Sequence, residues 1–344
     1  DKNNNVIRAN LYLLNDEKVE KFSFKDSNTT NITANELEQK EYHVTSVTSQ
    51  KRNRNPYAPF TTSTLQQSAS TNLKVSPRDV MSTAQKLYEA GLITYMRTDG
   101  IEMAPEGITS ARKQISNSLG DHYLPEKPRV FKNKAKNAQE AHECIRPTDF
   151  TKTPENAKNL NKSELDLYAL IWKRALASQA KAAEVLQTTV LISSLCDSAQ
   201  FRLSGQVVTF EGHLKIFQDT KKEDDDKRIP DIREESKMKL EKINKEQHFT
   251  EPPPRFNEAS LIKRLEEEGI GRPSTYASII SKIQERNYVK KEKNRLVPED
   301  TGRLLNFFLE AYFNKYIEYN YTAKLEENLD EISSGEKHWK DVIK

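Results

Sequence analysis

Cysteine is scarce in this sequence, and its apolar runs are short. Only 2 of the 344 residues are cysteine, too few for a disulfide framework or a cysteine-rich zinc site. No apolar run approaches the roughly 20 residues that a membrane-spanning helix needs. These absences exclude a membrane protein and favour a reducing, cytoplasmic compartment. The sequence starts at Asp1 without methionine or a signal peptide, so we expect a piece of a longer polypeptide.

An excess of one charge is also lacking. The 54 basic residues nearly cancel the 51 acidic residues, for a net charge of +3, whereas nucleic-acid binders usually carry a strong basic excess. The basic run at residues 51–54 suits phosphate contact and surface decoration equally. Aromatic residues, in contrast, are plentiful, with 13 Phe, 13 Tyr and 2 Trp. The length and this core material predict a globular chain of two or three domains.

Three stretches alternate polar and apolar residues, as half-buried strands do. They cover residues 6–50, 188–217 and 237–248. We interpret them as strands that can belong to one sheet.

Residues 56–185 instead repeat apolar residues at helical spacing. Ser76 and Pro77 are typical of a helix start, and that helix is expected to stop at Gly91. A second long amphipathic helix is predicted from 163 to 183. The pattern predicts a mainly helical domain inserted into a β domain.

Three prolines at 252–254 precede the pattern of a winged helix-turn-helix. Asn257 can cap a helix that ends at Gly269, a second helix follows around Tyr276, and residues 288–297 read as a hairpin. Winged domains of this outline bind nucleic acid, but the same order of elements also occurs in proteins that bind none.

Residues 91–100 carry the most informative chemistry. Side chains two apart share one side of an extended chain, so Tyr95, Arg97 and Asp99 are expected to face the same way. A phenol beside a guanidinium suits attack on a phosphodiester, because the planar arginine fork matches the phosphoryl oxygens. Asp99 would orient Arg97 or accept a proton. The alternative is a strand with an aromatic core residue and a surface ion pair.

Four longer motifs follow one another along the chain: PYAPFTTSTLQQ (56–67), GLITYMRTD (91–99), QEAHECIRPT (139–148) and FNEASLIKRLEEEGIGRPSTYA (256–277). The second closely resembles the active-site segment of the type IA DNA topoisomerases, which cut one DNA strand and hold its 5′ end on a tyrosine. The other three resemble further motifs of that family, in the family's order. The likeness spans about 56 to 290, and the flanks fit the same layout.

The resemblance implies roles for the residues of the active-site segment. Tyr95 matches the nucleophile, Arg97 the residue that positions the scissile phosphate, and Thr94 and Asp99 their neighbours. His142 matches a histidine near the active site, where an imidazole can relay a proton or donate to a phosphate. A helix-surface or capping histidine is the alternative.

The resemblance also implies DNA contacts. Arg272, Ser274 and Thr275 precede a helix, where hydroxyls, the guanidinium and unpaired N–H groups suit a phosphate, although a plain helix cap is the alternative. Arg146 either contacts DNA or braces the site. Gln66, in a run of uncharged polar residues before a helix, suits contact with sugar and phosphate, although hydroxyl-rich helix caps are the alternative.

The Mg²⁺ of the family is held by acidic residues of a Toprim domain, and no such strand-borne acidic motif occurs in this sequence. The three aspartates at 224–226 lie among Lys and Glu, which is typical of a solvated loop rather than a metal site. We expect no metal ligand in this chain. The Toprim domain and a C-terminal DNA-binding region are expected elsewhere in the same polypeptide, and the 344 residues alone are expected not to relax supercoiled DNA.

The fold that the resemblance implies is a multi-domain α+β core, in which a β-rich arch with inserted, mainly helical, winged-helix-like DNA-binding domains forms part of a torus. The expected domains are the arch (1–54, 182–210 and 229–253), the tyrosine-bearing helical domain (55–181) and part of a helical DNA-binding domain (211–228 and 254–344).

The implied function is relaxation of negatively supercoiled DNA in the bacterial nucleoid, at single-stranded regions, without ATP. One alternative is a decatenase of the topoisomerase III type, although Met96 argues against it because that branch tends to carry proline there. The other is a winged-helix nucleic-acid binder without catalysis. A DNA 5′ phosphate trapped on Tyr95 would exclude the second alternative.

Overall fold

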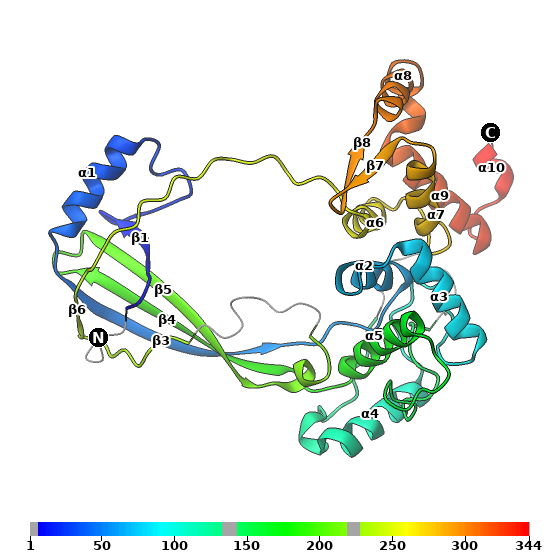
Figure 1. Ribbon diagram of the computed structural model, residues 1–344, viewed down its shortest axis with the longest axis horizontal. Helices are drawn as coiled ribbons and strands as arrows, with labels where there is room; N and C mark the ends of the chain where they lie inside the picture. The colour runs from blue at the N-terminus through cyan, green and yellow to red at the C-terminus, as the bar shows by residue number, and fades with distance from the viewer. Residues whose placement is uncertain (1–5, 133–142, 219–227, 344) are drawn as a thin grey trace. The chain divides into compact units, whose positions relative to one another are not determined.

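The computed structural model describes residues 6–132, 143–218 and 228–343, and the chain divides into two compact units (Figure 1). The first unit consists of Asp1–Asn55, Ala182–Glu211 and Thr220–Pro252, and the second of Pro56–Lys181, Gly212–Asp219 and Pro253–Lys344. Each unit has its own hydrophobic core, built from segments that are distant in sequence.

One antiparallel sheet of six strands forms the first unit. The strand order is β2-β1-β5-β4-β3-β6, with β1 Asn10–Leu14, β2 Glu17–Lys18, β3 Tyr42–Arg54, β4 Ala183–Ser194, β5 Ala199–Phe210 and β6 Lys237–Met238. All three alternating stretches therefore contribute to one sheet, as the sequence predicted. The longest pairing joins β3 to β4, from Tyr42 opposite Ser194 to Arg54 opposite Ala183.

The core of the first unit lies on one face of this sheet. Tyr42 and Val44 alternate along β3, and Val190 and Ile192 alternate along β4, so their side chains share a face and are buried together with Ile232. The Tyr42 hydroxyl donates a hydrogen bond of 2.8 Å to the Leu37 carbonyl oxygen, and burial raises its pKa to about 12.

Two parts of the strand prediction are wrong. Residues 27–38 form helix α1 (Ser27–Glu38), because the Asp26 carboxylate caps its first turn through the Thr29 N–H at 2.8 Å. Residues 237–248 contribute only the two-residue strand β6, which pairs with Tyr42 and His43. Since β3 begins at Tyr42, the residues after Met238 run past its end and have no strand of the sheet to pair with there.

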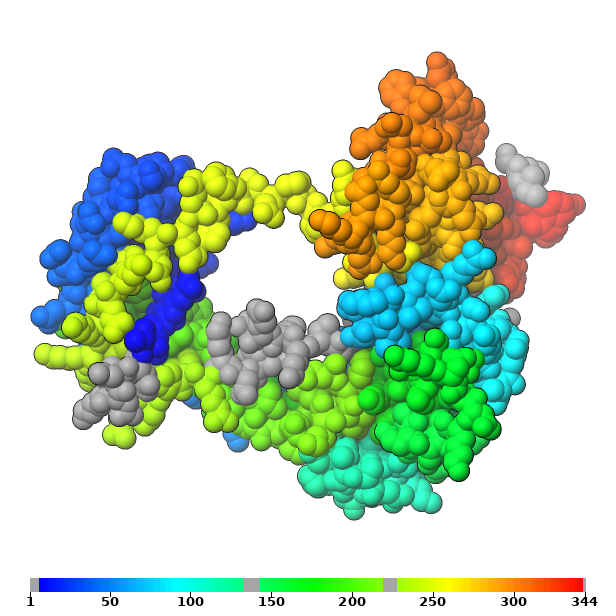
Figure 2. All heavy atoms as spheres, viewed as in Figure 1, coloured from blue at the N-terminus to red at the C-terminus, as the bar shows by residue number. Residues whose placement is uncertain are grey.

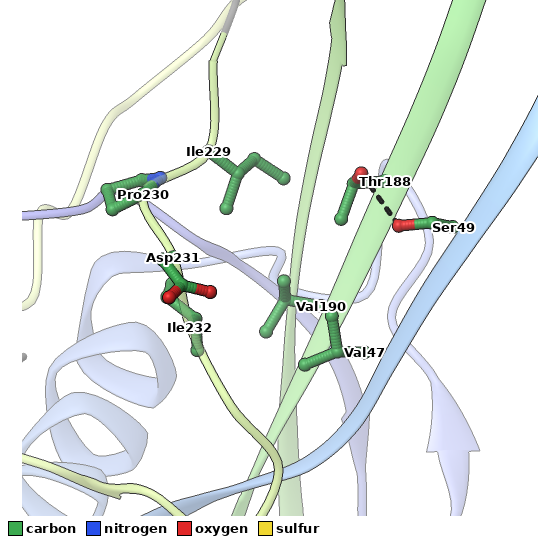
Figure 3. A pocket seen from close by; sticks show the side chains of 8 residues that line it. All are labelled: Val47, Ser49, Thr188, Val190, Ile229, Pro230, Asp231 and Ile232. Atoms are coloured by element: carbon green, nitrogen blue, oxygen red, sulfur yellow. Dashed lines mark hydrogen bonds between the residues drawn. The ribbon is translucent and has the colours of Figure 1, made fainter.

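A hollow of about 210 Å³ lies in the first unit between β3, β4 and residues 229–232 (Figure 3). Its walls combine aliphatic side chains with the Ser49 and Thr188 hydroxyls, which lie 3.0 Å apart, and the Asp231 carboxylate. These groups do not form a set of metal ligands or a nucleophile with a base.

The amino-terminal part of the second unit is helical. Its helices are α2 Thr62–Asn72, α3 Pro77–Glu89, α4 Pro105–Leu119 and α5 Lys162–Ser178. The predicted helix start at Ser76 and Pro77 is confirmed, and the Ser76 hydroxyl caps α3 by accepting from the Asp79 N–H at 3.2 Å. The core centres on the fully buried Phe60, Leu65, Leu87, Ile93, Met96, Ile145, Phe150, Tyr168, Ile171 and Leu176.

Helix α5 ends earlier than the predicted 183. Gln179 leaves the helix, and its side-chain amide pairs with the Arg129 backbone at 3.0 and 3.3 Å. These bonds replace the next helical turn, and β4 of the first unit then begins at Ala183.

The carboxyl-terminal part of the second unit contains α6 Glu258–Glu267, α7 Tyr276–Glu285, β7 Val289–Glu292, β8 Arg295–Pro298, α8 Asp300–Ile317, α9 Tyr319–Ser333 and α10 Trp339–Ile343. Asn257 caps α6, and Gly269 follows it with φ +71°, as predicted. The β7–β8 turn places Lys293 and Asn294 at positive φ. The predicted order of helix, turn, helix and hairpin is confirmed.

Helix α8 is apolar yet has no buried residue among those that the structure describes. Leu304 is 70% exposed, Phe307 68% and Tyr312 73%. The helix forms much of the orange surface in Figure 2.

Candidate active site

Tyr95 lies in an irregular segment that follows α3. The segment is not a regular strand, because Ile93 forms only an isolated bridge with Pro147 and the chain bends at Met96 and Arg97. Hydrogen bonds to neighbouring segments, rather than a sheet, therefore fix its course.

Exposure alternates along this segment. Met96 and Thr98 are 1% and 2% exposed, whereas Tyr95 is 42% exposed and Arg97 is also exposed. Asp99 is half-buried. The alternation is that of an extended chain, and it places the predicted nucleophile outside the core.

Tyr95 and Arg97 are both accessible for chemistry. The Tyr95 ring packs edge-on against Tyr88, with centroids 5.3 Å apart and planes at 65°. Within the described residues, the Tyr95 hydroxyl has no hydrogen-bond partner and the Arg97 guanidinium has no carboxylate partner. The surface ion pair of the alternative interpretation is therefore not seen at Arg97 in this part of the chain.

Thr94 holds the segment on the amino-terminal side of Tyr95. Its N–H donates to the Arg146 carbonyl oxygen at 2.9 Å, and its hydroxyl donates to the Cys144 carbonyl oxygen at 2.7 Å. The same hydroxyl accepts from the Arg146 N–H at 3.0 Å. Thr94 therefore ties the tyrosine segment to the segment that follows residue 142.

Thr62, the first residue of α2, holds the segment on the other side. Its hydroxyl donates to the Met96 carbonyl oxygen at 2.7 Å, with the Thr98 carbonyl oxygen at 3.1 Å, and accepts from the Thr98 N–H at 2.8 Å. Its own N–H donates to the Thr98 carbonyl oxygen at 2.9 Å. Tyr95 and Arg97 thus project from a backbone that is anchored on both sides.

Asp99 lies near the buried phenol of Tyr276, the first residue of α7. Tyr276 is 6% exposed, and burial raises its pKa, with Glu266 and Asp99 adding to the rise and Arg272 opposing it. The phenol of Tyr276 is therefore neutral and buried, unlike that of Tyr95.

Arg272 is engaged by two carboxylates of α9. Its guanidinium lies 3.0 Å from Glu326 Oε2 and 2.7 Å from Asp330 Oδ2, and the Gly271 N–H donates to Glu326 Oε1 at 2.9 Å. Desolvation opposes the charge of Arg272, but these carboxylates raise its pKa. In this structure the guanidinium braces the turn before α7.

The other two predicted residues of that turn differ in setting. Ser274 is exposed. The Thr275 hydroxyl accepts from the Arg272 N–H at 2.8 Å, and α7 begins without a side-chain cap bond. The N–H groups of Thr275 and Tyr276 donate to the Arg272 carbonyl oxygen at 2.8 and 3.2 Å. The turn is thus preformed, with the Ser274 hydroxyl at its surface.

Arg146 is buried, at 6% exposure. Its guanidinium contacts both carboxylate oxygens of Glu143, at 2.5 and 3.1 Å, and donates to the Pro147 carbonyl oxygen at 2.9 Å. These contacts favour bracing of the site over DNA contact. Burial raises the pKa of Cys144 to about 12, so its thiol is a packing group. His142 lies outside the described residues.

Gln66 is fully buried in α2, and neither its amide nitrogen nor its amide oxygen has a hydrogen-bond partner among the described residues. It lies one turn after Thr62, on a helix that packs against α6 (Figure 1). On this helix the Ser63 hydroxyl donates to the Glu266 carboxylate at 2.5 Å. The Gln66 side chain is therefore not accessible to DNA in this structure, contrary to the predicted contact.

The described residues contain no group of three or more His, Cys, Asp and Glu side chains arranged to hold a metal ion. The aspartates at 224–226 lie outside them. In the same described ranges, no helix has the length and apolar character needed to cross a membrane.

Three residues that shape the site were not predicted from the sequence. Thr62 appeared only as one member of a hydroxyl-rich run, although the apolar Leu65 and Ala69 on the same helix face indicate that this face is buried. Glu326 and Asp330 are separated from Arg272 by more than 50 positions and carry no local signal of pairing.

Comparison with known proteins gives one consistent family. The family model described as DNA topoisomerase matches residues 2–344. The DNA topoisomerase 1 of Rickettsia felis is 44% identical over 357 residues, which cover 100% of this chain and 46% of that protein. The DNA topoisomerase 1 of Zymomonas mobilis is 45% identical, over 95% of this chain and 27% of that protein.

A solved structure agrees with these relatives. The full-length topoisomerase I of Thermotoga maritima superimposes with a TM-score of 0.83 at 33% identity, over 97% of this chain and 54% of that chain. The chain thus spans about half the length of the relatives it matches, or less, and has their α+β fold. The predicted family is confirmed, and the chain belongs to the DNA topoisomerase family, as a catalytic-core region of the type IA topoisomerase I enzymes.

Proposed function

We propose that Tyr95 is the nucleophile with which the full-length protein cuts one DNA strand. The observation that carries this proposal is the pair of accessible side chains, Tyr95 and Arg97, on a backbone segment anchored at Thr94 and Thr98. A nucleophile must be exposed to a polymeric substrate yet fixed in direction. Cys144 does not meet that requirement because it is fully buried.

The reaction that suits this geometry is a reversible transesterification. The Tyr95 oxygen bonds to phosphorus, the bond from phosphorus to the 3′ oxygen breaks, the phenol proton leaves and the 3′ oxygen takes up a proton. Religation is the reverse, with the 3′ hydroxyl as nucleophile and the tyrosine as leaving group. One phosphate ester replaces another, so ATP is not needed. His142 remains a candidate for moving one of these protons.

Arg97 supports the phosphate during this exchange. Its guanidinium is exposed two residues from Tyr95 and has no carboxylate partner in the described chain, so its donors remain available to phosphoryl oxygens. Negative charge on these oxygens is stabilised by such a fixed cation. Asp99, half-buried on the same segment, would orient the phosphate-binding groups.

DNA contacts beyond the scissile phosphate are proposed at the turn before α7. The exposed Ser274 hydroxyl and the positive end of the α7 dipole suit a backbone phosphate, with Thr275 beside them. Arg272 braces this turn and would contact DNA only by exchanging its α9 carboxylates. Arg146 is proposed as a brace of the tyrosine segment, and Gln66 would contact DNA only after α2 and α6 part.

Mg²⁺ is not assigned to this chain. The described residues do not fit a magnesium site, because no three or more of their His, Cys, Asp and Glu side chains are grouped so as to hold a metal ion. The family's Toprim domain would hold the ion in the full-length protein, and no step above depends on it.

Relaxation of negative supercoils is the proposed outcome for the full-length protein. The similar bacterial relatives are named DNA topoisomerase 1, which favours this branch over a decatenase. We propose that the sheet of the first unit is the arch, that the helical parts of the second unit bind DNA, and that together they form part of a ring around the passing strand.

A covalent trapping experiment tests this function. The full-length protein is mixed with a single-stranded oligonucleotide labelled at its 3′ end and then denatured. The label should migrate with the protein, and peptide mapping should place it on Tyr95, because the 3′ fragment carries the 5′ phosphate. Tyr95→Phe should trap no label, whereas Tyr88→Phe, a change to the neighbouring ring, should still trap it. Label on Tyr95→Phe would overturn the assignment.

A further inference from the structure

We propose that Thr62 is a positioning residue for the cleavage reaction. Its buried hydroxyl and N–H hold the backbone on both sides of Arg97, so that Arg97 and Tyr95 face the same phosphate. This inference rests on the proposed function of Tyr95 and adds a residue that touches neither DNA nor the reacting atoms.

The hydrogen bonds of Thr62 surround Arg97. The Met96 carbonyl oxygen precedes it, and the Thr98 N–H and carbonyl oxygen follow it; all three are bonded to Thr62 at 2.7 to 2.9 Å. With these backbone groups fixed, the backbone dihedral angles of Arg97, which set the direction in which its side chain leaves the chain, have little freedom. The guanidinium itself has no carboxylate partner in the described residues, so no other contact of that kind orients it.

The location of Thr62 makes this anchor rigid. Thr62 is the first residue of α2, and Leu65 and Ala69 root the helix in the core at 0% exposure. N–H groups in the first turn of a helix have no intrahelical partner, and here one of them binds the tyrosine segment. A β-branched side chain also restricts the rotation of its hydroxyl.

Thr94 provides the corresponding anchor before Tyr95, through the Cys144 and Arg146 backbone. Tyr95 therefore lies between two hydroxyl anchors, while its own phenol makes no hydrogen bond to a described residue. Loss of the Thr62 anchor should disturb Arg97 more than Tyr95, because its bonds lie at residues 96 and 98.

Thr62→Val tests the role in the full-length protein, because valine keeps the shape and removes the hydroxyl. A displacement of about 1 Å in a reacting group costs on the order of 10²-fold in rate. We expect single-turnover cleavage of an oligonucleotide to slow about 10- to 100-fold, with DNA affinity within about threefold of wild type. Thr62→Ser restores the oxygen and should cleave within about threefold of wild type.

The matched control is Thr61→Val, the neighbouring change on the same helix. Thr61 caps α2 through Thr64, and within the described residues its side-chain bonds go to Ser63 and Thr64 rather than to the tyrosine segment. This variant should lower the melting temperature and leave the cleavage rate close to wild type. A purely structural role for Thr62 would instead make the two variants alike in cleavage once matched for stability.

Hydrogen exchange gives a readout that does not depend on activity. Thr62→Val removes the acceptor of the Thr98 N–H, so a peptide covering residues 96–100 should exchange faster, while the same peptide in Thr61→Val should not. Unchanged exchange in Thr62→Val would show that the hydroxyl does not hold this segment and would overturn the proposal.

Cleavage by Thr62→Val at the wild-type rate would also overturn it. If Thr62→Val does not fold, Thr62→Ala is compared with Thr62→Ser instead. Equal cleavage rates of these two variants would overturn the proposal. Failure of the proposed function is distinguishable, because wild-type protein would then trap no DNA on Tyr95. A trapping wild type with an unaffected Thr62→Val contradicts only the role of Thr62.

Discussion

Replacing Gln66 with methionine should make the protein more stable. Gln66 is 0% exposed, and both polar atoms of its amide lack partners in the described structure. The folded state therefore takes an amide out of water without a compensating hydrogen bond. Methionine has nearly the same length and shape and carries no group that needs a partner.

The expected gain follows from the cost of burying such a group. An unpaired buried polar group costs about 1–3 kcal/mol, so relief of one amide should add about 2 kcal/mol to the free energy of unfolding. For a unit of this size, that gain raises the melting temperature by roughly 4–8 °C. DNA affinity should stay unchanged, because the amide is not accessible.

Thermal unfolding of Gln66→Met and Gln67→Met measures this difference. Gln67 is the adjacent residue of α2 and is half-exposed, so the same chemical change there should alter stability by less than about 0.5 kcal/mol. A melting temperature of Gln66→Met below that of wild type would refute the reasoning, because it would show that the amide is hydrogen-bonded. Weaker DNA binding by Gln66→Met would refute its inaccessibility.

Three further experiments test other parts of the structure. Arg97→Ala in the full-length protein should slow cleavage about 10²–10³-fold with binding nearly intact, and normal cleavage with lost binding would assign Arg97 to DNA grip. Arg272→Ala should lower the free energy of unfolding by about 2 kcal/mol, measured in denaturant, because it removes the cation that contacts two α9 carboxylates; the cost is below that of a fully buried pair since the guanidinium is 26% exposed. An unchanged denaturation midpoint would contradict the bracing role of Arg272. Hydrogen bonds from Ser198 and Ser194 lower the pKa of Cys196 to about 7, so alkylation of its thiolate should rise as the pH passes through about 7, while Cys144, whose pKa burial raises to about 12, stays unmodified in the folded protein. Mass spectrometry of the alkylated chain measures the modified fraction of each cysteine. If alkylation of Cys196 rose steeply only near the ordinary pKa of a thiol, the lowered pKa of Cys196 would be contradicted.

The sequence predicted those elements that local rules determine. The helix starts at Ser76 and Asn257 were predictable because a capping acceptor and its N–H lie within three residues of each other. The same rule applies to Asp26 and Thr29, but the alternation of polar and apolar residues around them favoured strands, so α1 was not predicted. Helix α1 buries only Ala34 and Leu37.

Long-range pairing was beyond the reach of the sequence. Thr62 binds backbone groups 34 and 36 positions away, and Arg272 binds a carboxylate 58 positions away. These separations are unrelated to the repeat of a helix or a strand, so neither the composition nor the apolar pattern of the sequence indicates which residues pair. The alternation from Tyr95 to Asp99 was predictable because an extended backbone directs successive side chains to opposite sides.

The Tyr95 phenol makes no hydrogen bond within the described chain, which bears on the reaction that joins it to DNA. A tyrosine whose oxygen was hydrogen-bonded inside the protein would have to give up that bond on esterification, and the intact state would be favoured by its free energy. Tyr95 is held by its backbone and by edge contact with Tyr88, and in the described chain its oxygen has no such bond to lose. Esterification of Tyr95 would therefore break no hydrogen bond between its oxygen and the described chain.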